Sequence, residues 1–219
     1  MGGVAVFAAL GVWQLERRVW KLDLIARVEQ RVHAPAIALP VGAQGAADEY
    51  RHVALAGHWR SGAETWVRAT TELGPGWWEL SALKLADGRT VFVNRGFVAR
   101  PGTPGADEPA SGITLTGLIR PSEPGGSFLR PNVPAANRWY SRDVAALAAA
   151  HGLGRVEPFF VDADAAPQPA AGAPIGGLTV IRFRNEHLQY ALTWFALALG
   201  LGYAGWQVRR GAWGADDDA

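Results

Sequence analysis

The sequence predicts a membrane protein of the α+β class, in which a two-helix transmembrane hairpin encloses an antiparallel, β-rich extramembrane domain. Three observations predict this class. Residues 188–208 contain no charged side chain, and neither do residues 1–15. Between these stretches, short apolar segments alternate with turn residues. This pattern is typical of a strongly bent antiparallel sheet with a barrel-like shape, and it leaves room for one helix.

The C-terminal uncharged stretch is the stronger of the two signals. At about 1.5 Å per residue, a helix over residues 188–208 would reach about 31 Å, which matches a hydrocarbon core of about 30 Å. Arginines flank the stretch on both sides. We expect a transmembrane helix over residues 187–208 and a cytoplasmic tail over residues 209–219. The alternative is a buried helix of a water-soluble domain.

The N-terminal stretch is shorter. Residues 1–15 would span about 22 Å as a helix, so the first transmembrane helix is expected to be truncated. Apolar residues continue at three- and four-residue spacing, which predicts one helix with an extension in water over residues 1–33. Most flanking basic residues lie on the domain side. The positive-inside rule alone would therefore place the domain in the cytoplasm, but the rule is weak for so long a loop.

The predicted extramembrane domain covers residues 34–183. An Asp-Gly pair at Asp87 suits a tight hairpin turn, and Gly62 is expected to turn between two strands. One helix is expected to begin with Ser141 as its N-cap and to stop at Gly152. The expected strands cover residues 50–59, 64–70, 77–85, 90–98, 113–119, 158–161 and 178–183, with surface loops over residues 100–112 and 162–177.

The composition excludes several classes of protein. A net charge of +1 gives no general attraction for nucleic acid, and the absence of cysteine excludes disulfides, thiolate metal sites and a cysteine nucleophile. The five histidines follow no metal-ligand spacing, and no phosphate-binding loop or nucleophile elbow is present. We therefore expect no catalytic residue. Gly96 is expected to mark a bulge or a close backbone contact, with a role in binding as the alternative.

His187 is the candidate ligand. It lies one residue before the uncharged stretch, and helical spacing places Tyr190 and Trp194 on the same face. An imidazole can bind haem iron, and tryptophan and tyrosine rings can pack on a porphyrin. The alternative is an interfacial histidine that hydrogen-bonds to water or to a lipid headgroup.

Several short motifs follow one another in a fixed order along the chain. Each is weak alone, but together they resemble the surfeit-locus-one family, the Shy-type cytochrome c oxidase assembly factors, from about Gly11 to Trp206. The motifs lie at residues 11–15, 20–21, 24–25, 57–59, 74–78, 93–98, 117–120, 137–140 and 183–194.

The resemblance implies a role in the assembly of haem-a-containing cytochrome c oxidase, in which the protein assists the insertion of haem a into the catalytic subunit. It implies His187 as the ligand of the haem iron, and Arg182 and Arg184 are then candidates to pair with the haem propionates. Glu186 or a backbone carbonyl is expected to hold the other ring nitrogen. The implied location is the cell inner membrane, with several spans and the large domain on the periplasmic face, rather than its mitochondrial equivalent.

The expected partners are the oxidase catalytic subunit, haem a synthase as a further candidate, and the lipid bilayer, but no nucleic acid. Two alternatives remain at this point. A purely structural chaperone would pack on the oxidase subunit without binding haem. A membrane-tethered enzyme would use the region around Asn94 and Arg95, but the sequence shows no nucleophile–base pair for it.

Overall fold

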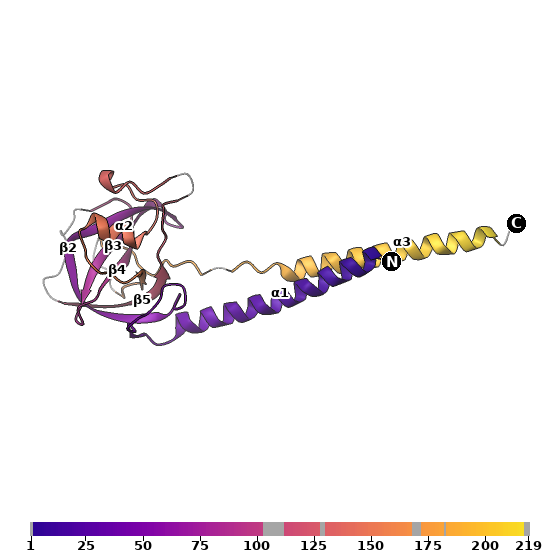
Figure 1. The fold of residues 1–219 in the computed structure, drawn as a ribbon, viewed down its shortest axis with the longest axis horizontal. Coiled ribbons are helices and arrows are strands. Elements are labelled where there is room, and N and C mark those ends of the chain that lie inside the picture. Colours follow the sequence, from indigo (N-terminus) through magenta and orange to yellow (C-terminus); the bar gives the residue numbers. More distant parts are fainter. Residues whose placement is uncertain (1, 103–111, 128–129, 168–171, 182, 217–219) are drawn as a thin grey trace. The chain divides into compact units, whose positions relative to one another are not determined.

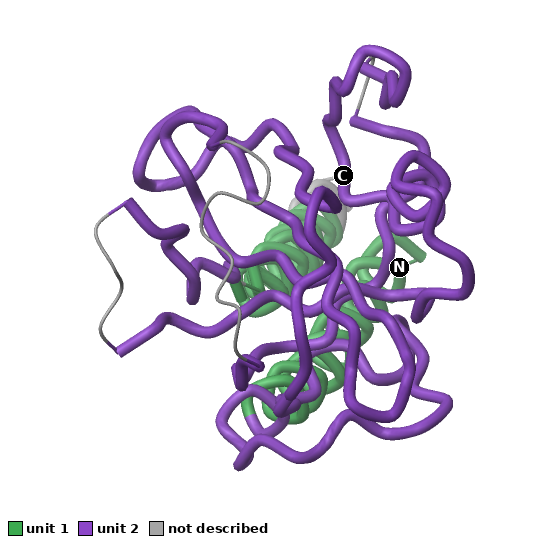
Figure 2. Tube along the Cα trace, turned by 90° about the vertical axis from the view of Figure 1, so that its left-hand side faces the viewer, with its two compact units in different colours: residues 1–29, 181–219 green, residues 30–180 purple. Residues whose placement is uncertain are grey.

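The protein is described here from a computed structural model, which covers residues 2–102, 112–127, 130–167, 172–181 and 183–216. The chain divides into two compact units. One unit contains residues 1–29 and 181–219, and the other contains residues 30–180. Figure 2 shows the two units in different colours. Part of the expected loop over residues 100–112 and Arg182 lie outside the described residues.

Two long helices form the first unit. Helix α1 spans Gly2–His33, as the apolar spacing predicts, and its last residues belong to the second unit; helix α3 spans His187–Asp216. The two helices lie side by side in the first unit (Figure 1). Gly11 allows this close approach, because a Cβ atom there would lie 2.5 Å from the ring of Phe195.

The predicted transmembrane hairpin is wrong. Within the described part of the chain, no helix is both long enough and apolar enough to cross a membrane. Helix α3 has 30 residues, so its composition sets the limit rather than its length. The prediction counted absent charges, but an uncharged stretch need not be strongly apolar. Gln189, Tyr190 and Thr193, together with Gly200 and Gly202, lower the mean hydropathy of the stretch.

A six-stranded sheet forms the second unit. Its strands follow one another in space in the order β1-β2-β3-β4-β6-β5, and β2 also pairs with β5. The prediction of an antiparallel sheet is therefore wrong, because the sheet is mixed: β1 runs parallel to β2, and β4 runs parallel to β6. The strands span Ile37–Ala38 (β1), His52–Thr71 (β2), Gly74–Leu85 (β3), Thr90–Val98 (β4), Ile113–Pro121 (β5) and Phe159–Ala163 (β6).

Strand β2 contains an irregularity where the sequence predicted a turn. The register between β2 and β3 shifts between Trp59 and Glu64, and Gly62 lies at this shift with a φ of +76°. The two predicted strands are thus one long strand with a bulge, which bends the strand and lets it pair with β5 on one part and with β3 along most of its length.

The strands bury side chains on both faces of the sheet. Alternate residues of β4 and β6, such as Val91 and Val161, belong to one hydrophobic cluster, while Phe92 and Phe160 belong to the other. This two-sided burial explains why these two strands read as continuous apolar runs. The second cluster is covered by Trp139 and by the buried side chains of the short helix α2.

Helix α2 spans Val144–Ala150 and follows a 3-10 helix, η1, at Pro134–Ala136. Its N-cap is Asp143, whose carboxylate accepts a hydrogen bond from the backbone N–H of Ala146 at 3.1 Å. The prediction of Ser141 as N-cap is therefore wrong. The Ser141 hydroxyl instead donates to the carbonyl of Glu123 at 2.7 Å. Gly152 follows the helix with a φ of +60°, which confirms the predicted stop.

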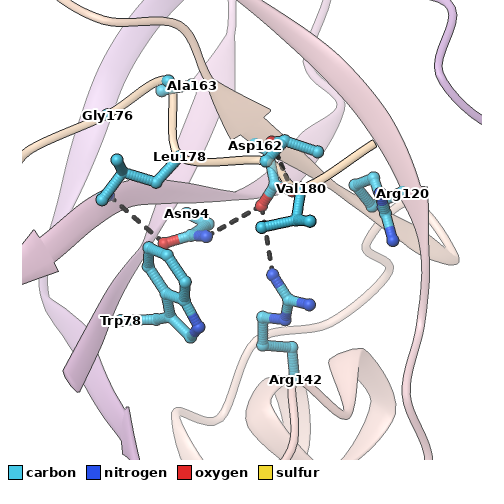
Figure 3. A pocket seen from close by; sticks show the side chains of 12 residues that line it. Trp78, Asn94, Arg120, Arg142, Asp162, Ala163, Gly176, Leu178 and Val180 are labelled. Carbon is cyan, nitrogen blue, oxygen red and sulfur yellow. Dashed lines mark hydrogen bonds and ion pairs between the residues drawn. The ribbon is translucent and has the colours of Figure 1, made fainter. Parts of the chain in front are cut away.

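The expected last strand is absent from the described residues between 178 and 183, which have no regular structure. A side-chain hydrogen bond attaches this segment to β6 instead: the hydroxyl of Thr179 donates to Oδ2 of Asp162 at 3.0 Å. The other oxygen of Asp162 accepts from Asn94 at 2.8 Å and from Arg142 at 3.3 Å. Figure 3 shows this network around one buried carboxylate.

Gly96 combines both predicted features. The register between β3 and β4 shifts beside it, and its backbone has a φ of +133°. A Cβ atom at this position would lie 2.2 Å from the carbonyl oxygen of Ile175. The predicted bulge and close backbone contact are both confirmed, because the neighbouring Phe97 exchanges backbone hydrogen bonds with Ile175.

We predict that Gly96→Ala destabilises the protein more than Gly74→Ala. Both positions have positive φ, so each substitution should cost about 1–2 kcal/mol of unfolding free energy. Space around a Cβ is open at Gly74 but blocked by backbone at Gly96, which should add about 1–3 kcal/mol. Denaturant unfolding of the two variants measures the difference. Equal losses would show that the segment at Ile175 moves aside freely.

Two histidines of the second unit have pKa values shifted in opposite directions. Burial alone would lower the pKa of His52, but its ring nitrogens bond to the Ala34 carbonyl and the Asp164 carboxylate, each at 2.8 Å, and these bonds raise it. Burial lowers the pKa of His151, against the opposing effects of Glu64 and of a bond to the Gly62 backbone.

These shifts predict opposite pH dependences. The protonated His52 stabilises the fold, so its contribution is complete below pH 6.5 and is lost as the pH rises through the higher folded-state pKa. The neutral His151 stabilises the fold, so its contribution is complete above pH 6.5 and is lost as the pH falls through the lower folded-state pKa. His52→Asn should therefore cost more stability at pH 5.5 than at pH 8.5, and His151→Asn should cost more at pH 8.5. Thermal unfolding of both variants at the two pH values measures these stability losses. If both variants lost more stability at the same pH, the opposite pKa shifts of His52 and His151 would be contradicted.

Candidate functional site

The candidate ligand His187 is the first residue of α3 and is half-buried. Its Nδ1 lies 2.7 Å from Oε1 of Gln14 on α1. Because an amide oxygen accepts, this geometry assigns the ring proton to Nδ1 and leaves the lone pair on Nε2. A fixed Nδ1–H is the arrangement that metal-binding histidines normally have. Gln14 therefore does what was expected of Glu186 or of a backbone carbonyl.

Arg184 and Glu186 pair with each other instead. Nη2 of Arg184 lies 2.6 Å from Oε1 of Glu186, and the arginine side chain is 88% exposed. The guanidinium is therefore accessible to solvent, but it already pairs with the carboxylate of Glu186. A propionate at this position would have to compete with Glu186. Arg182, the other arginine expected to bind propionates, lies outside the described residues.

The two aromatic candidates differ in accessibility. Tyr190 is more than half exposed, while Trp194 is half-buried. The Trp194 ring stacks on Phe7, with 5.7 Å between the ring centroids and 25° between the planes. One face of Trp194 is thus used to join α3 to α1, whereas the Tyr190 ring is free to contact a flat ligand.

An apolar groove between α1 and α3 belongs to the same unit and encloses about 510 Å³. Its surface suits a hydrocarbon chain, because aliphatic and aromatic atoms predominate in it. It is lined by Val4, Ala8, Phe195, Ala198, Leu199, Gly202 and Tyr203.

If a haem bound to this unit, His187 would be the residue to hold its iron. His187 offers one free nitrogen, and the unit offers exposed aromatic and apolar surface. Among the described residues, no group of three or more histidine or acidic side chains could hold a bare metal ion. The described residues thus offer one imidazole ligand, which would suit the iron of a haem better than a bare metal ion.

Sequence reasoning missed Gln14, although the signal was present. Gln14 is a polar amide among the apolar residues of the N-terminal stretch, and it stands in one of the motifs quoted above. Such an isolated amide calls for a hydrogen-bond partner. The partner lies 173 residues further along the chain, so no local pattern identifies it.

A second cavity, of about 180 Å³, lies over the sheet beside Asp162 (Figure 3). Arg142 and Asp162, which line it, already bond to each other, whereas Arg120 pairs with Glu49 at 3.6 Å and its Nε has no hydrogen-bond partner among the described residues. Arg142 donates from Nε to Glu123 at 3.1 Å and from Nη1 to Asp162 at 3.3 Å. Burial would raise the pKa of Glu123, but the bonds to Arg142 lower it. We therefore interpret this cavity as part of a structural network.

The chain is similar to one known protein family over most of its length. The pattern of the SURF1 family matches residues 2–199. Surfeit locus protein 1 of Mus musculus is 37% identical over 92% of this chain and 72% of its own length. The Homo sapiens protein of that name is 35% identical over 89% of this chain and 71% of its own length. A SURF1-like protein of Monosiga brevicollis is 34% identical over 86% of this chain and 78% of its own length. The chain belongs to the SURF1 family, which confirms the resemblance found in its motifs.

We predict that Gln14 sets the tautomer of His187. In the native protein the neutral ring should carry its proton on Nδ1, because Gln14 Oε1 accepts it. Gln14→Leu should remove this preference, while Gln189→Leu, an exposed position on α3, should not. The ¹⁵N chemical shifts of the imidazole nitrogens at pH 8 report the tautomer. An unchanged tautomer in Gln14→Leu would mean that another group orients the ring.

Proposed function

We propose that this protein is an assembly factor for haem-a-containing cytochrome c oxidase. In this proposal it holds haem a transiently at His187 and assists its insertion into the oxidase catalytic subunit. Membership of the SURF1 family supports the assembly role. The hydrogen bond between His187 and Gln14 is the observation that supports a ligand role, because it holds one ring nitrogen and leaves the other available.

Transient binding suits the chemistry of this site. A single imidazole binds haem iron more weakly than a pair of axial ligands, so a receiving protein can take the haem over. Tyr190 is exposed and can pack on the edge or face of the ring. Arg184 can pair with a propionate once it leaves Glu186, because an ion pair between solvent-exposed side chains is weak.

The proposal assigns no catalytic turnover to the chain. Haem a is the cargo, and the catalytic subunit is the recipient; haem a synthase is the candidate donor. The placement of the large domain on the periplasmic face stays a prediction of the family resemblance.

One observation favours a second function. The His187–Gln14 bond also joins α3 to α1, as does the stacking of Trp194 on Phe7. A purely structural chaperone would use these contacts only to hold its helices together for contact with the oxidase subunit. The two functions differ in whether Nε2 of His187 has a ligand to bind.

We expect deletion of the gene to lower the amount of assembled haem-a oxidase, and His187→Ala to restore assembly only in part. His187→Ala should lose most of the bound haem, because it removes the iron ligand, while the rest of the chain can still hold the recipient. Gln14→Leu should lie between the wild type and His187→Ala, because it keeps the ligand but frees the ring. The measurements are the haem a absorbance of membranes and the haem per purified protein by pyridine haemochrome.

The outcomes separate the two functions. Equal haem content in wild type and His187→Ala, with oxidase assembly restored by both, would favour the structural chaperone. Unchanged oxidase in the deletion strain, in a host with one copy of the gene, would contradict the assembly role. His33→Ala serves as the matched control, because it removes a different histidine, at the C-terminal end of α1.

A further inference from the structure

A cluster of arginine and aromatic side chains surrounds a cavity of about 200 Å³ in the unit of residues 30–180. Two of the family-like motifs meet there, and the proposed function uses neither of them. We call this cluster the arginine–tryptophan surface. Its lining residues are Trp66, Arg68, Trp77, Asn137, Arg138, Trp139 and Tyr140.

The register of β2 and β3 builds one side of this surface. Arg68 stands directly opposite Trp77, and its guanidinium carbon lies 4.8 Å from the centroid of the Trp77 ring. Trp66 stands two residues before Arg68 on the same face, opposite Glu79. The strand pair therefore presents two large aromatic rings and one cation side by side.

The segment after η1 builds the other side and is held rigidly. The backbone N–H of Arg68 donates to the carbonyl of Trp139 at 2.9 Å, which joins the segment to β2. Asn137 adopts a φ of +46°, and its side-chain oxygen accepts from the indole N–H of Trp139 at 2.9 Å. Arg138 and Val133 exchange backbone hydrogen bonds. The surface is thus formed before any partner arrives, which lowers the entropy cost of binding.

The charge of the surface is not balanced by its neighbours. Arg68 and Arg138 are exposed, and neither forms an ion pair with a described residue. Arg130 adds a third cation, 5.9 Å from the Tyr140 ring. The carboxylate of Glu79 is already bound by other groups, Arg95 at 2.7 Å and the Trp66 indole at 3.3 Å.

We propose that the arginine–tryptophan surface docks an acidic segment of a partner protein. One aspartate or glutamate side chain of that segment enters the cavity and pairs with Arg68 and Arg138, while the rings of Trp77 and Tyr140 flank it. Arginine, tryptophan and tyrosine are the residues that carry most of the binding energy in protein interfaces. The charge complements a carboxylate, and the rigid frame fixes its position. This inference stands independently of haem binding at His187.

The test uses the full chain and a defined peptide, acetylated and amidated, of four glutamates around one leucine. The NMR signals of the indole N–H groups, with Trp77 assigned by Trp77→Phe, should shift saturably as the peptide is added. A double variant, Arg68→Gln with Arg138→Gln, should weaken binding about tenfold or more. The control Arg60→Gln with Arg155→Gln loses the same charge from exposed positions outside the surface and should bind as the wild type does.

Trp77→Leu is the second test variant. It keeps both arginines, and it should also weaken binding because it removes one of the two rings that flank the bound side chain. Equal affinity in the wild type and the Arg68/Arg138 double variant would overturn the proposal. The proposal would also be overturned if a peptide with lysine in place of each glutamate bound equally well. Shifts of the Trp77 signal by inorganic phosphate, of the same size as those by the peptide, would show a general anion site and would also overturn it.

Discussion

The buried carboxylate of Asp162 constrains the rest of the β domain. It is 6% exposed, and a carboxylate so placed destabilises a fold strongly unless charged and hydrogen-bonding partners surround it. Its partners come from three separate parts of the chain: Asn94 on β4, Arg142 just before α2, and Thr179 on the connection toward α3. One buried side chain on the short strand β6 therefore bonds to the neighbouring strand β4 and to two segments that lie outside the sheet.

The same network reaches the surface through a chain of hydrogen bonds. Arg142 holds Glu123, whose backbone carbonyl accepts from Ser141. The Ser141 hydroxyl also accepts from the side-chain amide of Asn132, and the oxygen of that amide accepts from the backbone N–H of Tyr140. The irregular segment after η1 thus takes its shape from the core. This explains how a segment with so little regular structure can present aromatic and cationic side chains in a fixed arrangement.

Local patterns in the sequence predicted the local features well. Strand β4, the turn at Gly88, the end of α2 and the close contact at Gly96 each follow from a few neighbouring residues. Features that depend on distant residues were not predictable. Glycine at position 62 suggests a turn as readily as a bulge, and only pairing with both β3 and β5 decides for the bulge.

The candidate site shows the same limit. His187 could be found because it stands alone beside an uncharged stretch, but its partner Gln14 could not, because the two helices pack by tertiary contacts. The predicted transmembrane hairpin failed for a different reason, because counting charges ignores the polar and small residues between them. Reading absent charge as strong hydrophobicity overstated one property and led to the wrong fold class.

The order of the strands has a consequence for biosynthesis. Strand β6 lies between β4 and β5, although it is made last of the three. At a synthesis rate of about 5–20 residues per second, β4 waits about 3–12 s for its neighbour. During that interval its edge offers unpaired backbone groups beside Phe92 and Val93, which is the kind of edge that recruits foreign strands. Chains that stall on the ribosome before Phe159 should therefore be the aggregation-prone and protease-sensitive form of this protein, whereas chains that extend beyond Ala163 contain all six strands of the sheet.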